Sequence, residues 1–279
     1  MSTARQLTRI AVLAALACAL VYVVALGTRW GLRVDAKALP GSTGGIAWER
    51  AHAAARRAVH TISVATILVG AVGAALVALR RQRRDLAVVA IATLAGANLT
   101  TFVLKPLLGH ADALGGEASR TINDSFPSGH ATAAMSLALV AVVVSPRRWR
   151  PWVAVAAAAY AATIGVALVL RFDHYPSDVV GGYLVATAWA TAMAAIALRH
   201  REHAVPAPAP LPMPPRGTLL IALGLVIAAA GLLAAPARHL DHGVFAVSAV
   251  AIAGIALLLP VGLTFVLARG DRRPRAQRP

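Results

Sequence analysis

The sequence has a single cysteine and few charged or aromatic residues. Of its 279 residues, 14% are charged and 5% aromatic, whereas 58% are hydrophobic, and the mean hydropathy is +0.69. One cysteine excludes an intrachain disulfide and a cysteine metal site, and we interpret Cys18 as a small apolar residue. Soluble domains carry about 25% charged residues. The shortage of charge therefore indicates lipid as the solvent, and the abundance of Ala, Val and Leu favours helices over a β-barrel.

Acidic residues are also scarce. The chain has 11 Asp and Glu against 27 Lys and Arg, a formal net charge of +16. Such a charge is common in nucleic-acid-binding proteins, but no recognition motif accompanies it here. The basic residues stand in short clusters between apolar runs, as they do in the cytoplasmic loops of membrane proteins. We therefore expect a membrane protein with no nucleic-acid partner.

Long apolar runs dominate the sequence. A helix needs about 20 apolar residues to cross a bilayer. Runs of this kind lie near 9–28, 59–79, 86–107, 129–145, 151–170, 179–198, 217–236 and 244–268. The sequence thus predicts an all-α, polytopic membrane helix bundle with a six-helix core and two C-terminal transmembrane helices.

A Pro-rich segment divides this predicted bundle, because proline breaks helices and favours extended linkers. The predicted divisions are the core at 1–203, a cytoplasmic linker at 204–216, a two-helix tail at 217–268 and a basic cytoplasmic C-terminus at 269–279. The first apolar run is longer than a signal-peptide core and lacks a clear cleavage region, so we interpret it as an uncleaved anchor.

The basic clusters predict the orientation in the membrane. With the N-terminus in the cytoplasm, the clusters at 80–84, 147–150, 199–216 and 269–278 also face inward and hold most of the basic residues. The outer loops hold few, apart from one long loop at 29–58. The positive-inside rule therefore places both termini in the cytoplasm of a multi-pass cell-membrane protein.

Three polar patches stand at the predicted outer ends of the core helices. Lys105 ends the third span, Ser-Phe-Pro-Ser-Gly-His at 125–130 opens the fourth, and Arg-Phe-Asp-His-Tyr-Pro-Ser-Asp at 171–178 joins the fifth to the sixth. The stretch between His130 and His174 is long enough for two crossings and a return to the same face. We therefore expect the three patches to meet near the outer membrane boundary.

The patch at 125–130 has the chemistry of a phosphate site. A proline followed by small residues is typical of a helix start, whose free N–H groups and positive dipole end attract phosphate. Gly129 lets the ligand approach the backbone closely, and Ser128 can donate a further hydrogen bond. His130 would stand where it can protonate a leaving oxygen.

His174 and Asp178 are four residues apart on either side of Pro176. A carboxylate at this spacing can hold one imidazole nitrogen and leave the other as a nucleophile. Lys105 can supply positive charge to phosphate oxygens. Taken singly, these residues are common: a loop histidine, an interfacial lysine or an acidic residue at a helix start. Their occurrence together, each at a membrane boundary on the same side, indicates a site.

These residues resemble the motifs of the type 2 phosphatidic acid phosphatase (PAP2) family, in particular its bacterial integral membrane branch. The family is similar in its core to vanadium haloperoxidases. Its motifs are Lys-x6-Arg-Pro, Pro-Ser-Gly-His and Ser-Arg-x5-His-x3-Asp. Lys105 matches the first, 127–130 match the second completely, and His174 with Asp178 match the end of the third. The resemblance covers roughly residues 10–200 and extends into the Val-Val-Gly-Gly at 179–182.

The resemblance implies a six-helix core, an external active site and no metal or cofactor. His174 would attack phosphorus and form a phosphohistidine, and Asp178 would orient His174. His130 would protonate the leaving alcohol and then activate water. The residues implied to hold the phosphate oxygens are Lys105, Ser128 and Gly129.

Two parts of the family pattern are missing. The arginine and proline of the first motif fall on Asp112 and Ala113, and the Ser-Arg of the third falls on Ala167 and Leu168. Both phosphate-clamping arginines are thus absent from their usual positions, and one such donor is worth about 10²–10³ in rate.

Replacements for these arginines stand nearby. Arg171 lies one helical turn beyond Leu168, and Arg120 lies in the loop before 125–130. We therefore expect Arg171, and Arg120 after it, to take over the clamp. The alternative for Arg171 is an interfacial anchor or a partner of Asp173. His110, two residues before Asp112, is a further polar neighbour.

The leading interpretation is a membrane phosphatase acting on a lipid phosphate or polyprenyl (di)phosphate at the outer leaflet. A second interpretation is a catalytically silent homologue that binds anionic lipid or scaffolds an envelope complex. A transporter or channel is less consistent with the sequence, because no span carries a charge near its centre. A haloperoxidase fits neither the membrane spans nor the missing arginines.

Overall fold

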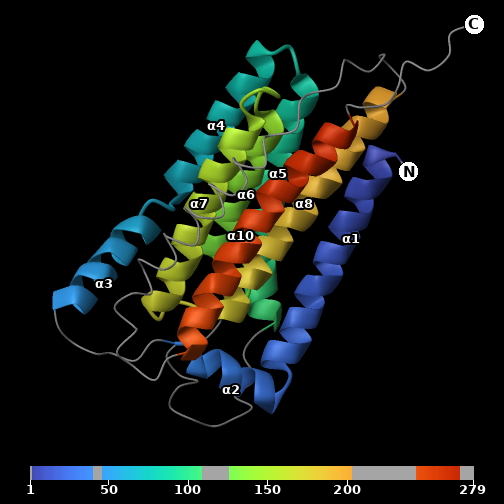
Figure 1. The fold of residues 1–279 in the computed structure, drawn as a ribbon. Coiled ribbons are helices and arrows are strands. Elements are labelled where there is room, and N and C mark those ends of the chain that lie inside the picture. Colours follow the sequence, from blue (N-terminus) through green and yellow to red (C-terminus); the bar gives the residue numbers. More distant parts are fainter. Residues whose placement is uncertain (1, 40–45, 109–125, 203–242, 271–279) are drawn as a thin grey trace, which may run out of the picture.

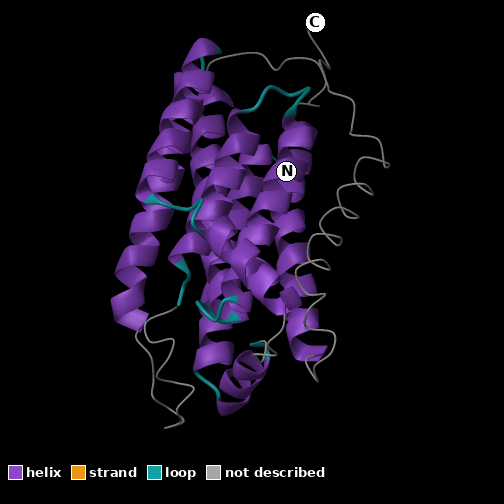
Figure 2. Cartoon of the chain, turned by 90° about the vertical axis from the view of Figure 1, so that its left-hand side faces the viewer, coloured by secondary structure: helices purple, strands orange, loops and turns teal. Residues whose placement is uncertain are grey.

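The computed structural model describes residues 2–39, 46–108, 126–202 and 243–270, and the secondary structure in these ranges is helical (Figure 1, Figure 2). The all-α fold predicted from the sequence is confirmed. The helices are α1 (Thr3–Val21), the π-helix η1 (Tyr22–Leu26), α2 (Arg29–Lys37), α3 (Ile46–Val59), α4 (Val64–Arg80), α5 (Arg84–Leu108), α6 (Gly129–Val144), α7 (Arg150–Leu170), α8 (Pro176–Glu202) and α10 (Gly243–Gly270).

Several helices have the length and composition of membrane spans. Among the described residues, five stretches qualify: Thr3–Leu26, Arg84–Leu108, Arg150–Leu170, Pro176–His200 and Val244–Ala268. Trp48–Val59 and Val64–Arg80 make a sixth if this pair, bent by 53°, is one broken span. The predicted linker at 204–216 and the predicted span at 217–236 lie outside the described residues.

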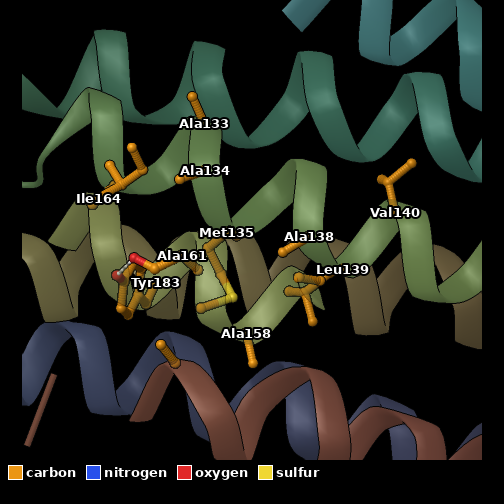
Figure 3. Close-up of a cluster of buried hydrophobic side chains, with 14 of the residues drawn as sticks. Ala133, Ala134, Met135, Ala138, Leu139, Val140, Ala158, Ala161, Ile164 and Tyr183 are labelled. Atoms are coloured by element: carbon orange, nitrogen blue, oxygen red, sulfur yellow. Dashed lines mark hydrogen bonds between the residues drawn. The ribbon is translucent and has the colours of Figure 1, made fainter. Parts of the chain in front are cut away.

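The helix α6 is the centre of the bundle, and α4, α5, α7, α8 and α10 pack around it. Its 16 residues make it about 24 Å long. Met135 and Leu139 are fully buried against Ala158 and Tyr183 from α7 and α8 (Figure 3). Small side chains let such helices approach closely. The Tyr183 hydroxyl donates to a backbone carbonyl of α7, so that its one polar group is satisfied within the apolar core.

The predicted outer loop at 29–58 is wrong as a loop, because most of it forms α2 and α3. Both helices are short and carry several charges, so a search for long apolar runs passes over them. Thr28 caps α2 by accepting a hydrogen bond from the Gly31 N–H at 2.9 Å. Gly31 is required there, since a Cβ atom would lie 2.1 Å from the carbonyl oxygen of Val24. This close approach folds α2 back against η1.

The last helix, α10, packs along α7 and also touches α6 and α8. Phe245, Ile252 and Leu263 of α10 are buried in the same hydrophobic cluster as the helices of the core. Gly165 of α7 makes the contact close: a Cβ atom there would lie 2.7 Å from the Ile252 side chain. This helix of the predicted tail therefore shares its buried surface with α6 and α7.

The two ends of the bundle are formed by different helix termini and turns. The N-terminus of α1, the α4–α5 turn and the α6–α7 turn lie at one end, and α2 lies at the other (Figure 1). The second end also holds the C-terminus of α5, the start of α6 and the α7–α8 turn. Trp30 is exposed at this end, and Trp149 and Trp152 are exposed at the first. Exposed tryptophans at both ends are typical of membrane–water interfaces.

Candidate active site

The starts of α6 and α8 are joined by a backbone hydrogen bond. The Ser128 N–H donates to the carbonyl oxygen of Asp178 at 2.9 Å. Gly182 makes this approach possible, because a Cβ atom there would lie 2.7 Å from the Ser128 carbonyl oxygen. Gly181 similarly accommodates the ring of Phe126, which a Cβ atom would meet at 2.5 Å. The two glycines therefore bring the Pro-Ser-Gly-His segment against the segment that carries His174.

The first turn of α6 leaves backbone donors for a ligand. The first N–H groups of a helix have no intrahelical acceptor. The Ser128 N–H is bonded to Asp178, and the Ala131 N–H donates to the Ser128 hydroxyl oxygen at 3.3 Å. Among the described residues, the N–H groups of Gly129 and His130 have no hydrogen-bond acceptor. A Cβ atom on Gly129 would meet nothing within 4 Å, so the space beside it is open. Ser128, which is fully buried, acts here as the helix cap.

His174 and Asp178 are in contact, and both are buried. Nδ1 of His174 lies 3.4 Å from Oδ2 of Asp178, long for a hydrogen bond but within ion-pair distance. The same carboxylate oxygen accepts from the Tyr175 N–H at 2.9 Å, which fixes the carboxylate at the first turn of α8. Among the described residues, Oδ1 of Asp178 has no hydrogen-bond partner. This arrangement engages Nδ1 of His174 and leaves Nε2 for chemistry.

The turn between α7 and α8 has an uncommon backbone. Phe172 adopts φ 61°, a left-handed conformation that usually belongs to glycine at a helix end. The Phe172 N–H donates to Val169 at 3.1 Å and the Asp173 N–H to Leu168 at 3.0 Å, which closes the end of α7. The ring of Phe172 packs 6.3 Å from that of Trp48 in α3. The strained turn that carries His174 is thus packed against α3 through the ring of Phe172.

His130 and Lys105 approach the same place from α6 and α5. The Thr101 and Thr132 hydroxyls lie 2.9 Å apart and join these helices one turn before Lys105 and just after His130. His130 is exposed, and its imidazole interacts electrostatically with four neighbouring residues, namely His174, Asp173, Lys105 and Arg171. Lys105 of α5, His130 of α6 and His174 of the α7–α8 turn are therefore neighbours at one end of the bundle.

Arg171, the first predicted replacement for the missing clamp arginines, has a partner within the protein. Arg171 forms an ion pair with Asp173, with Nε 2.7 Å and Nη2 3.4 Å from its carboxylate oxygens. Ala167 and Leu168, which stand in place of the third motif's Ser-Arg, are fully buried in the core. The other predicted substitute, Arg120, lies outside the described residues, as do His110 and Asp112.

Two residues missed in the sequence adjoin the site. The Ser177 N–H donates to Oδ1 of Asp35 in α2 at 3.2 Å, and the Ser177 hydroxyl donates to Oδ2. No spacing rule connects residues so far apart in the chain. Among the described residues, no group of three or more His, Cys, Asp or Glu side chains is arranged to hold a metal ion.

Comparison with known proteins adds one finding. Residues 86–202, from α5 to α8, match the family model of the PAP2 superfamily. This segment is similar to the PAP2 superfamily. It contains Lys105, the complete Pro-Ser-Gly-His motif and the His174–Asp178 pair. The match supports phosphatase-type activity on phosphate esters. No curated protein and no solved structure matches the chain.

Proposed function

We propose that this protein is a membrane-embedded phosphatase that hydrolyses a lipid phosphate or a polyprenyl (di)phosphate through a phosphohistidine intermediate. The observation that carries the proposal is the 2.9 Å hydrogen bond from the Ser128 N–H to the Asp178 carbonyl. Through this contact, a helix N-terminus suited to bind phosphate lies beside a carboxylate-held histidine.

In the first step, Nε2 of His174 attacks phosphorus while the bond from phosphorus to the lipid oxygen breaks. His130, as imidazolium, gives a proton to that leaving oxygen. In the second step, neutral His130 takes a proton from water, whose oxygen attacks phosphorus as the P–N bond breaks. Inorganic phosphate leaves and His174 is restored. Asp178 holds Nδ1 of His174 throughout, and Lys105 with the N–H groups of Gly129 and His130 binds the phosphate oxygens.

The surroundings of Lys105 support a lipid as the substrate. On the same helix, Phe102 is 75% exposed and Leu107 is 72% exposed. Exposed apolar side chains next to a phosphate site allow acyl or prenyl chains to remain in the bilayer during the reaction. The short α6 also fits, because about 24 Å is less than the roughly 30 Å hydrocarbon core, so at least one of its ends lies below headgroup level.

The orientation supports the outer leaflet. The basic clusters at the ends of α4 and α8 and at the start of α7 lie at the end of the bundle opposite the α7–α8 turn (Figure 1). If this basic end faces the cytoplasm, as the positive-inside rule requires, the site faces outward.

Phosphate release from a panel of lipid phosphates tests the proposal. The purified protein is assayed in lipid nanodiscs with EDTA, using phosphatidate, lysophosphatidate, a polyprenyl phosphate and a polyprenyl diphosphate. We expect release from at least one of them, and a loss of about 10³-fold or more in His174→Ala. His60→Ala is the matched control, because His60 is an exposed histidine away from the site. Undiminished release by His174→Ala would refute the assigned nucleophile.

Arg171 is the proposed phosphate clamp from the α7–α8 turn. Its ion pair with Asp173 uses only part of the guanidinium, whose five N–H groups can serve two acceptors. We expect Arg171→Ala to lower kcat/KM by about 10²-fold, as is typical for loss of one donor to the transition state. Asp173→Asn keeps the arginine and should retain more activity. Equal turnover in Arg171→Ala and the wild type would exclude the clamp.

One observation favours a second function, that of a catalytically silent lipid-binding or scaffold protein. The position of the third motif's arginine is Leu168, which is fully buried and cannot reach a ligand. The same assay separates the two functions. Release that depends on His174 supports the phosphatase, and retention of radiolabelled lipid phosphate without release supports the silent homologue.

A further inference from the structure

Asp35 stands at the start of α8, although it belongs to a helix outside the segment that matches the family model. Its carboxylate accepts two hydrogen bonds from Ser177, one from the backbone N–H at 3.2 Å and one from the hydroxyl. Ser177 is 7% exposed, and the next residue in the chain is Asp178. The contact therefore reaches the immediate neighbour of the carboxylate that holds His174.

The contact completes the first turn of α8. A helix start leaves N–H groups without intrahelical acceptors. The Tyr175 N–H donates to the Asp178 side chain at 2.9 Å, and the Asp178 N–H donates to the Tyr175 carbonyl at 3.1 Å. Pro176 has no N–H, so the Ser177 N–H is the remaining donor of this turn, and Asp35 satisfies it. The cap of α8 thus comes partly from α2.

The position of α2 follows from its own start. Thr28 caps α2, and the close approach at Gly31 folds the helix back against η1. Figure 1 shows α2 across the lower end of the bundle, below α8 and α10. Asp35 is thereby presented to the first turn of α8 from outside it.

We propose that Asp35 is a positioning residue for the His174–Asp178 pair. By holding Ser177, it fixes the first turn of α8, and with it the Asp178 carboxylate that directs the His174 imidazole. This inference rests on the proposed function. It adds α2, which lies outside the family match, to the structure that orients the nucleophile.

The electrostatics of Asp35 agree with this placement. The pKa of Asp35 is raised to about 7, chiefly by burial and to a smaller extent by the charge of Asp178, against the hydrogen bonds from Ser177, which lower it. Among the described residues, the titratable groups that interact with Asp35 are Asp178 on α8 and Tyr175 just before α8. At pH 6 Asp35 is therefore mostly protonated, and asparagine is a close substitute in both shape and charge.

Three variants assayed at pH 6 test the proposal. Asp35→Ala loses both bonds to Ser177, and Ser177→Ala keeps only the backbone bond. Asp35→Asn keeps an acceptor for the Ser177 N–H, and its amide N–H can donate to the Ser177 hydroxyl oxygen, so the second bond is made in the opposite direction. We expect kcat to fall about 10- to 100-fold in Asp35→Ala, with KM within about twofold, because a misplaced nucleophile slows chemistry more than binding. Asp35→Asn should restore kcat to within about threefold, and Ser177→Ala should lie between them. Glu49→Ala, an exposed acid on α3, is the matched control.

A second measurement does not depend on turnover. Hydrogen exchange of a peptide covering residues 175–180 reports on the first turn of α8 in nanodiscs. We expect faster exchange in Asp35→Ala and wild-type exchange in Asp35→Asn and Glu49→Ala. Wild-type kcat in Asp35→Ala, or wild-type exchange in that variant, would overturn the positioning role. If the wild type hydrolyses no lipid phosphate, the proposed function fails, whereas the exchange measurement still decides whether Asp35 holds the turn.

Discussion

At its N-terminal end, α6 presents Gly129 and His130 to open space, whereas at its C-terminal end its carbonyls are occupied by arginines. Arg81 donates to the Val144 carbonyl at 2.5 Å. Arg150 donates to the Val142 carbonyl at 3.2 Å and to the Ser145 carbonyl at 3.4 Å. Cations at a helix C-terminus and anions at its N-terminus are both stabilised by the helix dipole.

The difference separates structure from function along a single helix. At the basic end, the chain supplies its own counter-charges, so the helix end is complete without a ligand. At the other end, Ser128 and Ala131 are satisfied within the protein, and the remaining N–H groups lie beside open space and a histidine. Substitutions at the first end should therefore change stability alone, and those at the second should change activity first.

Among substitutions that leave the proposed catalytic side chains in place, the largest effect is expected from Gly182→Ala, which forces the two helix starts apart. The new Cβ atom would lie 2.7 Å from the Ser128 carbonyl oxygen and 2.9 Å from Oγ1 of Thr132. The backbone oxygen cannot turn away, so we expect kcat/KM to fall more than about 100-fold. Overpacking of about 1–3 kcal/mol should also lower the thermal unfolding temperature.

The matched control for Gly182→Ala is Gly254→Ala in α10, where a Cβ atom meets nothing within 4 Å. It should leave both kinetics and unfolding temperature close to those of the wild type. Full activity in Gly182→Ala would mean that the contact between the two helix starts does not organise the site.

Gly129→Ala tests the open space directly. Among the described residues, no atom outside the neighbouring residues of the same helix lies within 4 Å of the new methyl group, so the fold has room for it. Alanine is also a better helix former than glycine by about 0.5–1 kcal/mol. A phosphate bound to the Gly129 N–H would meet the methyl group, and we expect kcat/KM to fall about 10- to 100-fold. The unfolding temperature should stay the same or rise.

Gly73→Ala in α4 is the control for Gly129→Ala, because its Cβ atom also meets nothing within 4 Å. Lipid phosphate hydrolysis and thermal unfolding are measured on both variants. Unchanged kinetics in Gly129→Ala would show that the ligand does not approach the start of α6.

Arg81→Ala tests the opposite end. It removes a charged donor from the Val144 carbonyl, and we expect the free energy of unfolding to fall by about 1–2 kcal/mol. The kcat of lipid phosphate hydrolysis should remain within about twofold of the wild type, since the residue lies at the far end of α6. Arg80→Ala, an exposed neighbour, should change neither quantity. A large loss of kcat in Arg81→Ala, measured on correctly folded protein, would contradict the prediction that this end of α6 affects stability alone.

The sequence predicted the long apolar helices because each carries about 20 residues with little charge. It missed α2 and α3 because they are short and charged, and their positions depend on tertiary contacts. One is the folded-back turn at Gly31, and another is the packing of Trp48 on Phe172. Apolar length alone contains no signal for such helices.

The candidate site was likewise predicted only in part from the sequence. The sequence motifs predicted His130, His174 and Asp178. In the structure, the hydrogen bond from the Ser128 N–H to the Asp178 carbonyl brings their segments together. The role of Ser128 as a helix cap was hidden, because the same residue type serves a cap and a phosphate site equally well. Asp35 was missed because its partner, Ser177, is remote in sequence and only the fold joins them.

The smallest effect is expected from the titration of Asp35. Its pKa in the folded protein is about 7, above its ordinary value of 3.8, so the native state binds this proton more tightly than the unfolded chain does. Between about pH 4 and pH 7 the unfolded chain has lost the proton while the native state keeps it. The free energy of unfolding must therefore decrease as pH rises through this window. Asp35→Asn removes the titration.

The unfolding temperature of Asp35→Asn minus that of the wild type should consequently increase between pH 5 and pH 8, by about 2–4 °C for each kcal/mol involved. Thermal unfolding in nanodiscs at the two pH values gives the difference, and Glu49→Gln, which replaces an exposed acid, should give a constant one. A constant difference for Asp35→Asn would mean that Asp35 is ionised in the native state across this range. In that case the start of α8 would be capped by a carboxylate charge, and it would resemble the charge-capped end of α6 more closely than its open end.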